Sequence, residues 1–161
     1  MNPVDIAQLV TSGTAVVALG AAVWQVRSSR LQAQDATTHA YVARLTDATF
    51  TQALARSMDA LHLEAATEHA IAARWRRFER MKHEQQLEIT TPFNAFEAIA
   101  GLYNRNHLNR RIVEQQLEYT AAVVYERISW WIRRIQADDS GYFHEWELML
   151  GWFAERRLRA A

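Results

Sequence analysis

The sequence predicts an all-α protein in which a single N-terminal transmembrane helix is followed by an antiparallel helical bundle. Three observations indicate helices. The 161 residues include only two prolines and five glycines, so few residues interrupt a helix. Alanine, leucine, glutamate, glutamine and arginine, which favour helices, are abundant. Apolar residues also recur every three or four positions along much of the chain, as they do on one face of a helix.

The N-terminal residues 6–26 carry no charged side chain and read IAQLVTSGTAVVALGAAVWQV. At about 1.5 Å per residue, a helix of this length spans the hydrocarbon core of a bilayer. Asp5 precedes it, whereas Trp24, Arg27 and Arg30 cluster at its other end. Because positive residues favour the cytoplasmic side, we expect a single-pass protein of the inner membrane with its N-terminus outside and its C-terminal domain in the cytoplasm.

Two other interpretations of residues 6–26 have less support. A cleaved signal peptide begins with a basic region, and the first five residues contain only an acid. A buried helix of a soluble protein rarely runs so far without a charge. We therefore expect an anchor at residues 1–30, a juxtamembrane connector at residues 31–46 with a helix break near residues 35–38, and a cytoplasmic helical domain at residues 47–161.

Small and polar residues form one stripe along the predicted anchor, with spacings of four and three: Ala7, Thr11, Thr14, Ala18, Ala21 and Gln25. Small residues let helix backbones approach closely in lipid, and threonine or glutamine can hydrogen-bond to a partner helix. This small-residue stripe predicts a homo-oligomer, and one form of such a bundle is a pore. A chain rich in alanine also carries many small residues without any such role, and the sequence leaves both interpretations open.

The helical domain is expected to contain four main segments. The first runs from residue 48 to about residue 87, capped by Thr46 or Asp47, with a break near Leu63. Thr91 and Pro92 indicate the N-cap and first position of the next helix, which ends around residues 104–106. Asn109 caps a long helix at residues 110–136, in which an apolar stripe includes Val113, Leu117, Thr120, Val124, Ile128, Trp131 and Ile135. After a turn at residues 138–141, a last helix buries Phe143, Trp146, Leu150 and Phe153.

Arginine dominates the basic residues, since Lys82 is the only lysine. Its planar guanidinium suits bidentate contacts to phosphate. Residues 74–83 hold Arg74, Arg76, Arg77, Arg80, Lys82 and His83 interleaved with Trp75 and Phe78, and a second cluster lies at residues 105–111. These clusters predict a nucleotide or single-stranded oligonucleotide site with the ligand-binding residues Arg74, Arg77, Arg80, Arg105, Arg110 and Arg111. The alternative is a solvated face whose arginines pair with Glu68, Glu79, Glu84 and Glu114.

Catalytic patterns are missing from the sequence. It has no His-Glu-x-x-His motif, no P-loop and no dinucleotide-binding glycine pattern. No glutamate is followed three residues later by histidine, as di-iron bundles require, and without cysteine there is neither a thiol nucleophile nor a thiolate metal site. Glutamates among aromatic residues are expected to pair with arginines such as Arg127 or Arg133 rather than act as acids or bases: Glu97, Glu126, Glu145 and Glu147. We therefore expect no enzyme, no metal site and no cofactor.

A resemblance extends over residues 93–153, which contain FNAFEAIAGLYNRNHLNRRIVEQQLEYTAAVVYERISWWIRRI and later YFHEWELMLGWF. This part resembles an uncharacterised bacterial family of short proteins with an N-terminal membrane anchor and a helical cytoplasmic domain. The architecture also resembles membrane effectors of bacterial anti-phage defence, in which a nucleotide or oligonucleotide signal controls an oligomeric pore. The resemblance implies a membrane-anchored oligomeric effector controlled by such a ligand. A passive tether that holds a cytoplasmic protein partner at the membrane is the second hypothesis.

Overall fold

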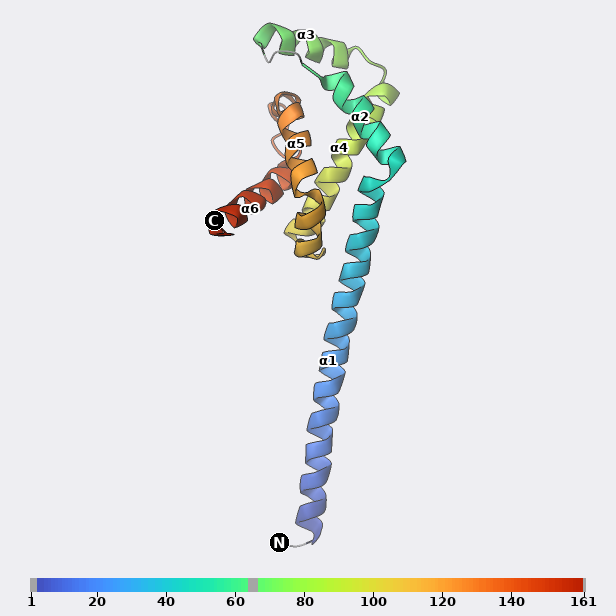
Figure 1. Cartoon of the computed structure of the whole chain (residues 1–161), viewed down its shortest axis with the longest axis vertical. Coiled ribbons are helices and arrows are strands. Elements are labelled where there is room, and N and C mark those ends of the chain that lie inside the picture. Colours follow the sequence, from blue (N-terminus) through green and yellow to red (C-terminus); the bar gives the residue numbers. More distant parts are fainter. Residues whose placement is uncertain (1–2, 64–66, 161) are drawn as a thin grey trace. The chain divides into compact units, whose positions relative to one another are not determined.

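The computed structural model describes the backbone of residues 3–63 and 67–160, and the side chains of residues 21–63 and 67–159. These residues form helices and no strand, so the predicted all-α class is confirmed (Figure 1). The helices are α1 (Pro3–Thr46), α2 (Ala48–Leu61), α3 (Glu68–Glu79), α4 (His83–Asn104), α5 (Arg110–Gln136) and α6 (His144–Ala160). The chain divides after Ala36 into two compact units, of which the second is called the helical domain below.

The predicted anchor lies mostly where side chains are not described. Within the part of the chain that the structure describes, no helix is both long enough and apolar enough to cross a membrane. Four residues of the small-residue stripe, Ala7, Thr11, Thr14 and Ala18, have side chains outside the described residues. The other two, Ala21 and Gln25, are exposed.

Helix α1 continues to Thr46, so the predicted break near residues 35–38 is wrong. No proline or glycine occurs between residues 21 and 46 to interrupt it. Thr38, in the predicted break, is a weak helix former, but it is fully buried, and its Oγ1 accepts the backbone N–H of Asn109 at 2.8 Å. This tertiary hydrogen bond compensates for the low helix propensity of threonine.

The predicted break near Leu63 is confirmed, because α2 ends at Leu61 and α3 begins at Glu68. Asp47 caps α2 through Oδ2, which accepts the Thr49 N–H at 3.0 Å. The expectation of helix continuing to residue 87 is wrong, since α3 ends at Glu79 and α4 begins at His83. The exposed Lys82 is the N-cap of α4, and its backbone N–H donates to Oε1 of Gln85 at 3.2 Å.

Pro92 lies inside α4 rather than at its start, which corrects the prediction of a helix beginning at Thr91 and Pro92. A proline has no N–H for the carbonyl four residues earlier, here that of Glu88. The buried Ser57 hydroxyl of α2 approaches this carbonyl oxygen at 3.5 Å, while it also donates to the Ala53 oxygen at 2.9 Å. The Ser57 hydroxyl of the neighbouring helix therefore partly replaces the backbone hydrogen bond that the Glu88 carbonyl lacks because of the proline.

Helix α4 presents a line of aromatic side chains to α5 and α6. Phe96 stacks on Trp146 with ring centroids 4.7 Å apart and an interplanar angle of 11°. Phe93 contacts Trp131 of α5 at 5.6 Å, and Tyr103 contacts Phe153 of α6 at 5.5 Å. Burying one such aromatic side chain stabilises a fold by about 1.5–3 kcal/mol. These three contacts account for why α4 is the helix around which α5 and α6 pack.

The prediction of α5 is confirmed at both ends, and the Asn109 Oδ1 accepts the N–H groups of Arg111 and Ile112 as an N-cap. The predicted apolar stripe of α5 needs one correction, because Thr120 is exposed and Ala121 is buried instead. The turn before α6 ends at Phe143, a buried residue with φ of 57°, a conformation uncommon for a large side chain.

Candidate anion-binding site

Three arginines of α3 and its C-cap line an open cavity of about 670 Å³. Arg76 and Arg80 are one helical turn apart, and Arg77 is three residues before Arg80, so the helix brings all three side chains to one side. Each is exposed. The remaining lining residues are Ala73, Met81 and Gln85, none of which carries a charge.

The arginines of this cavity form no ion pair with any residue that the structure describes. The ion pairs of the helical domain are made by Arg105, Arg156, Arg157 and Arg159 instead. Glu68, Glu79 and Glu84 therefore do not neutralise these arginines as ion-pair partners. Arg76 Nε donates to the Ala72 carbonyl at 3.3 Å, which leaves its charge uncompensated.

The position of the cluster at the C-terminal end of α3 affects its electrostatics in two ways. The helix dipole places about half a negative charge there, and basic side chains in the last turn stabilise the helix by about 0.3–1 kcal/mol. Arg76 and Arg77 lie in that turn. Three guanidinium charges exceed the dipole charge, so the residues that line the cavity keep a net positive charge, which favours anions.

Arg74 does not belong to this cavity. It is half-buried, and its Nη1 donates to the carbonyl of Ala60 on α2 at 3.4 Å. The aromatic residues Trp75 and Phe78 also point elsewhere, since Phe78 is buried against Trp131 at 5.7 Å. The expected interleaving of aromatic and basic side chains in one site is therefore wrong, because the 3.6-residue period separates them onto different faces of α3.

The second predicted arginine cluster does not assemble. Arg105 pairs with Glu145 at 3.0 Å. The Arg110 guanidinium lies over the rings of Tyr103 and Trp152, at 5.1 and 5.5 Å from their centroids. Arg111 is exposed and does not line the α3 cavity.

Of the six predicted ligand-binding arginines, the structure thus brings together Arg77 and Arg80. It adds Arg76, which belongs to the predicted cluster at residues 74–83 but not to the six predicted ligand-binding arginines. Its spacing of four from Arg80 is the sequence signal that identifies it.

Of the carboxylates among the aromatic residues, Glu145 pairs with an arginine as expected, here Arg105, whereas Glu97 and Glu147 have partners other than an arginine. Glu97 accepts the backbone N–H groups of Glu145 and Trp146 at 3.0 and 2.8 Å. Its burial raises the pKa of this carboxyl group, against the lowering effect of the two N–H donors. Glu147 accepts the Tyr125 hydroxyl, and burial together with this hydrogen bond raises the pKa of Tyr125.

Side chains able to bind a metal ion are dispersed over the described part of the chain. Among the residues whose side chains are described, no group of three His, Asp or Glu residues lies close enough to hold a metal ion.

Comparison with known protein families gives a match over most of the chain. A family profile described as Domain of unknown function (DUF4760) matches residues 12–151 of the chain. No curated protein and no solved structure matches the chain. The match runs from the N-terminal part of α1 into α6.

Proposed function

The chain belongs to the DUF4760 family. We propose that its helical domain binds a phosphate-rich ligand, a nucleotide or a short single-stranded oligonucleotide. The observation that supports the proposal is the α3 cavity, lined by Arg76, Arg77 and Arg80 and by no acid. We call these three residues the arginine site.

The chemistry of the arginine site suits phosphate. A guanidinium offers a planar set of N–H donors that fits two phosphate oxygens at once. No carboxylate has to be displaced before a ligand enters, because the site has no ion pair in the described structure. The site is also open, which favours an extended polyanion contacted at several phosphates over a ligand enclosed on all sides.

We further propose that residues 6–26 anchor this domain to the inner membrane, with the domain on the cytoplasmic side. Support comes from the absence of charge over that stretch and from Arg27 and Arg30 after it. The small-residue stripe, Ala7, Thr11, Thr14, Ala18, Ala21 and Gln25, supports a homo-oligomer. Together with the architectural resemblance to anti-phage membrane effectors, these features favour a ligand-controlled membrane effector, in which the anchors assemble into a pore.

A salt titration tests the phosphate-binding proposal. The full chain in non-ionic detergent is titrated with a fluorescent single-stranded oligonucleotide and, separately, with a cyclic dinucleotide. Binding is expected to weaken as salt rises, with a slope of about 0.7 per phosphate neutralised on a single strand. Arg77→Gln should weaken binding, whereas Arg127→Gln, which removes an exposed charge from α5, should not. Binding that is absent, or equal in the two variants, contradicts the proposal.

The passive tether is the second candidate, and one surface feature favours it. Leu148 and Trp152 of α6 lie one helical turn apart and are 44% and 46% exposed. Large exposed apolar residues on one helix face are typical of contact surfaces for a protein partner. If neither nucleic acid probe binds in a salt-dependent manner, the tether is the better account of the chain.

A further inference from the structure

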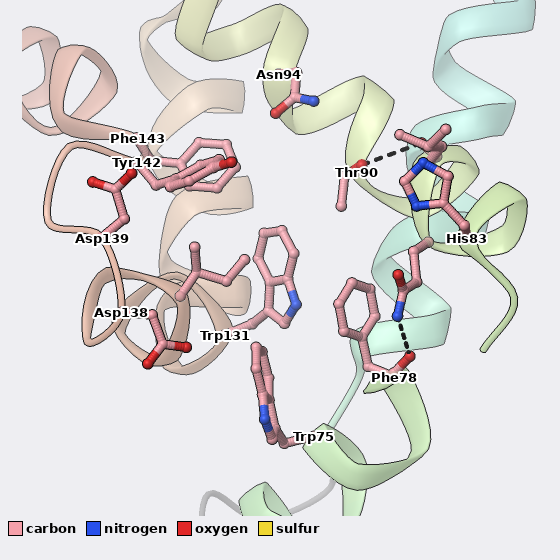
Figure 2. Close-up of a pocket in the computed structure, with 13 residues that line it drawn as sticks. Trp75, Phe78, His83, Thr90, Asn94, Trp131, Asp138, Asp139, Tyr142 and Phe143 are labelled. Atoms are coloured by element: carbon pink, nitrogen blue, oxygen red, sulfur yellow. Dashed lines mark hydrogen bonds between the residues drawn. The ribbon is translucent and has the colours of Figure 1, made fainter. Parts of the chain in front are cut away.

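A second cavity, of about 340 Å³, lies between α3, α4, α5 and the turn before α6 (Figure 2). It shares no lining residue with the arginine site. Five aromatic side chains contribute to its wall: Trp75, Phe78, Trp131, Tyr142 and Phe143. Its volume is within the range of pockets that bind small molecules, about 300–1,000 Å³. We call it the aromatic pocket.

The indole of Trp131 is the first indication of a ligand. Its side chain is fully buried, it lines the pocket, and its Nε1–H has no hydrogen-bond partner among the described residues. In Figure 2 the indole nitrogen lies on the ring edge that faces Phe78. The neighbouring Trp130 shows the usual arrangement, because its Nε1 donates to the Leu61 carbonyl at 3.3 Å.

An unpaired buried donor costs about 1–3 kcal/mol, so a ligand that offers an acceptor to Trp131 regains that energy. The Trp146 indole is also unpaired, but that residue lines neither the aromatic pocket nor the arginine site. Of these two unpaired indoles, that of Trp131 borders the aromatic pocket; its nitrogen is buried beside Phe78, so a ligand pairs with it by displacing the Phe78 ring.

The second indication is the charge of the pocket. Asp138 and Asp139 lie on one side of it, across from His83 on the other (Figure 2). Neither aspartate forms an ion pair with a described residue, although Asp139 Oδ1 accepts the Gly141 N–H at 2.9 Å. No arginine or lysine lines the pocket. Arg134, whose guanidinium lies 5.6 Å from the centroid of the Trp75 ring, is not a lining residue either.

Aromatic faces and carboxylates select the same kind of ligand. The face of an aromatic ring attracts a cation within about 6 Å, and an unpaired carboxylate adds direct attraction. The aromatic walls also favour an apolar or planar body over a fully hydrated ion.

We propose that the aromatic pocket binds a small organic cation. The ligand has an aromatic or apolar body against Trp75, Phe78 and Phe143, one hydrogen-bond acceptor that pairs with the Trp131 N–H, and an ammonium or guanidinium group beside Asp138 and Asp139. This site is independent of the arginine site, since the two attract ligands of opposite charge.

Three related probes separate the parts of this proposal. Tyramine carries an aromatic ring, a hydroxyl and an ammonium; phenethylamine lacks the hydroxyl; and 4-hydroxyphenylacetate has a negative charge in place of the positive one. Isothermal titration of the full chain should show binding of tyramine, weaker binding of phenethylamine by at least about fivefold, and weaker binding of 4-hydroxyphenylacetate by at least about tenfold. Failure of tyramine to bind, or equal affinity for the amine and the acid, overturns the proposal.

Matched variants locate the binding. Asp138→Asn should weaken tyramine binding by about tenfold, because it removes an exposed charge at the pocket while keeping the size of the side chain. Asp59→Asn makes the same change on α2, away from the pocket, and should have no effect. Trp131→Phe should abolish the preference for tyramine over phenethylamine. If Trp131→Phe loses its helical circular dichroism, the comparison of tyramine with phenethylamine in the wild type shows whether the hydrogen-bond acceptor of the ligand contributes to binding. An unchanged affinity in Asp138→Asn contradicts the assignment of the site.

Discussion

The carboxylate of Glu97 accepts the backbone N–H of Trp146 at 2.8 Å, so a side chain of α4 caps the first turn of α6. The N–H of Glu145 donates to the other oxygen of the same carboxylate at 3.0 Å. A carboxylate at this position satisfies donors that have no partner within their own helix and interacts favourably with the helix dipole. The contact between α4 and α6 is therefore polar at one end and aromatic along its length.

Removing this cap should destabilise the domain. We expect Glu97→Ala to lower the free energy of unfolding by about 1–2 kcal/mol, because two backbone donors lose their acceptor. Glu97→Gln, which keeps one acceptor oxygen, should cost less. Urea denaturation followed by circular dichroism measures both. The control is Glu126→Ala on the exposed surface of α5, and a cost as small as the control's would refute the capping role.

The pH dependence of stability should report the raised pKa of Glu97. Burial raises the pKa of its carboxyl group in the folded state above the ordinary value of 4.5, so the folded state binds the proton more tightly. The stabilisation from this group is fully present below pH 4.5 and is lost as the pH rises through the folded-state pKa. The difference in unfolding free energy between wild type and Glu97→Gln should fall over that interval. A difference independent of pH would show that the carboxyl group titrates alike in both states.

The contact between Ser57 and the Glu88 carbonyl leads to a double-mutant test. Ser57→Ala should cost about 1 kcal/mol, because it leaves that carbonyl without a partner beside Pro92. In the Pro92→Ala background, the substituted residue supplies a backbone N–H that can reach the same carbonyl, so the cost of Ser57→Ala should be smaller. Chemical denaturation of the two single variants and the double variant gives the coupling energy. Additive costs would mean that Ser57 acts only through its bond to Ala53.

The proposed anchor predicts a difference between two neighbouring positions. Ala18→Leu places bulk on the small-residue stripe and should weaken self-association, whereas Val17→Leu, which lies off the stripe, should not. Analytical ultracentrifugation in detergent measures the assembly. A monomeric wild type, or the same assembly in both variants, argues against the oligomer.

Membrane orientation is a separate test of the anchor. A reporter fused after Ala161 should be active in the cytoplasm, and replacing Arg27 and Arg30 by glutamate should weaken that orientation. The matched control replaces Arg111 and Arg127, exposed residues of α5 that form no ion pair with a described residue, by glutamate. Strong periplasmic activity of the unmodified fusion is the result that rejects the predicted topology.

Local signals were sufficient for some helices and not for others. The bounds of α5 follow from the Asn109 cap and from a stripe that keeps its period, and both lie within one segment. The start of α4 could not be predicted in this way. Pro92 usually marks a helix start, and the Ser57 hydroxyl that accommodates it comes from α2. Likewise, the hydrogen bond that keeps Thr38 helical comes from Asn109, 71 residues later.

For the arginine site as well, local sequence predicts one part of the arrangement, and contacts with distant residues determine the other. Periodicity alone places Arg76 and Arg80 on one face, but which face of α3 is buried depends on its partners. Phe78 packs against Trp131 of α5, and this contact removes the neighbouring aromatic residues from the arginine site. The aromatic pocket could not be recognised from the sequence, because its walls come from three helices and a turn.

The position of Lys82 makes the domain convenient to label. As the only lysine of the sequence and an exposed N-cap of α4, it is the single side-chain amine available to an acylating dye. Met81 before it lines the arginine site, and His83 after it lines the aromatic pocket. A fluorophore attached there stands between the two sites, so polyanion and organic-cation titrations can be followed optically on one labelled preparation without introducing a cysteine.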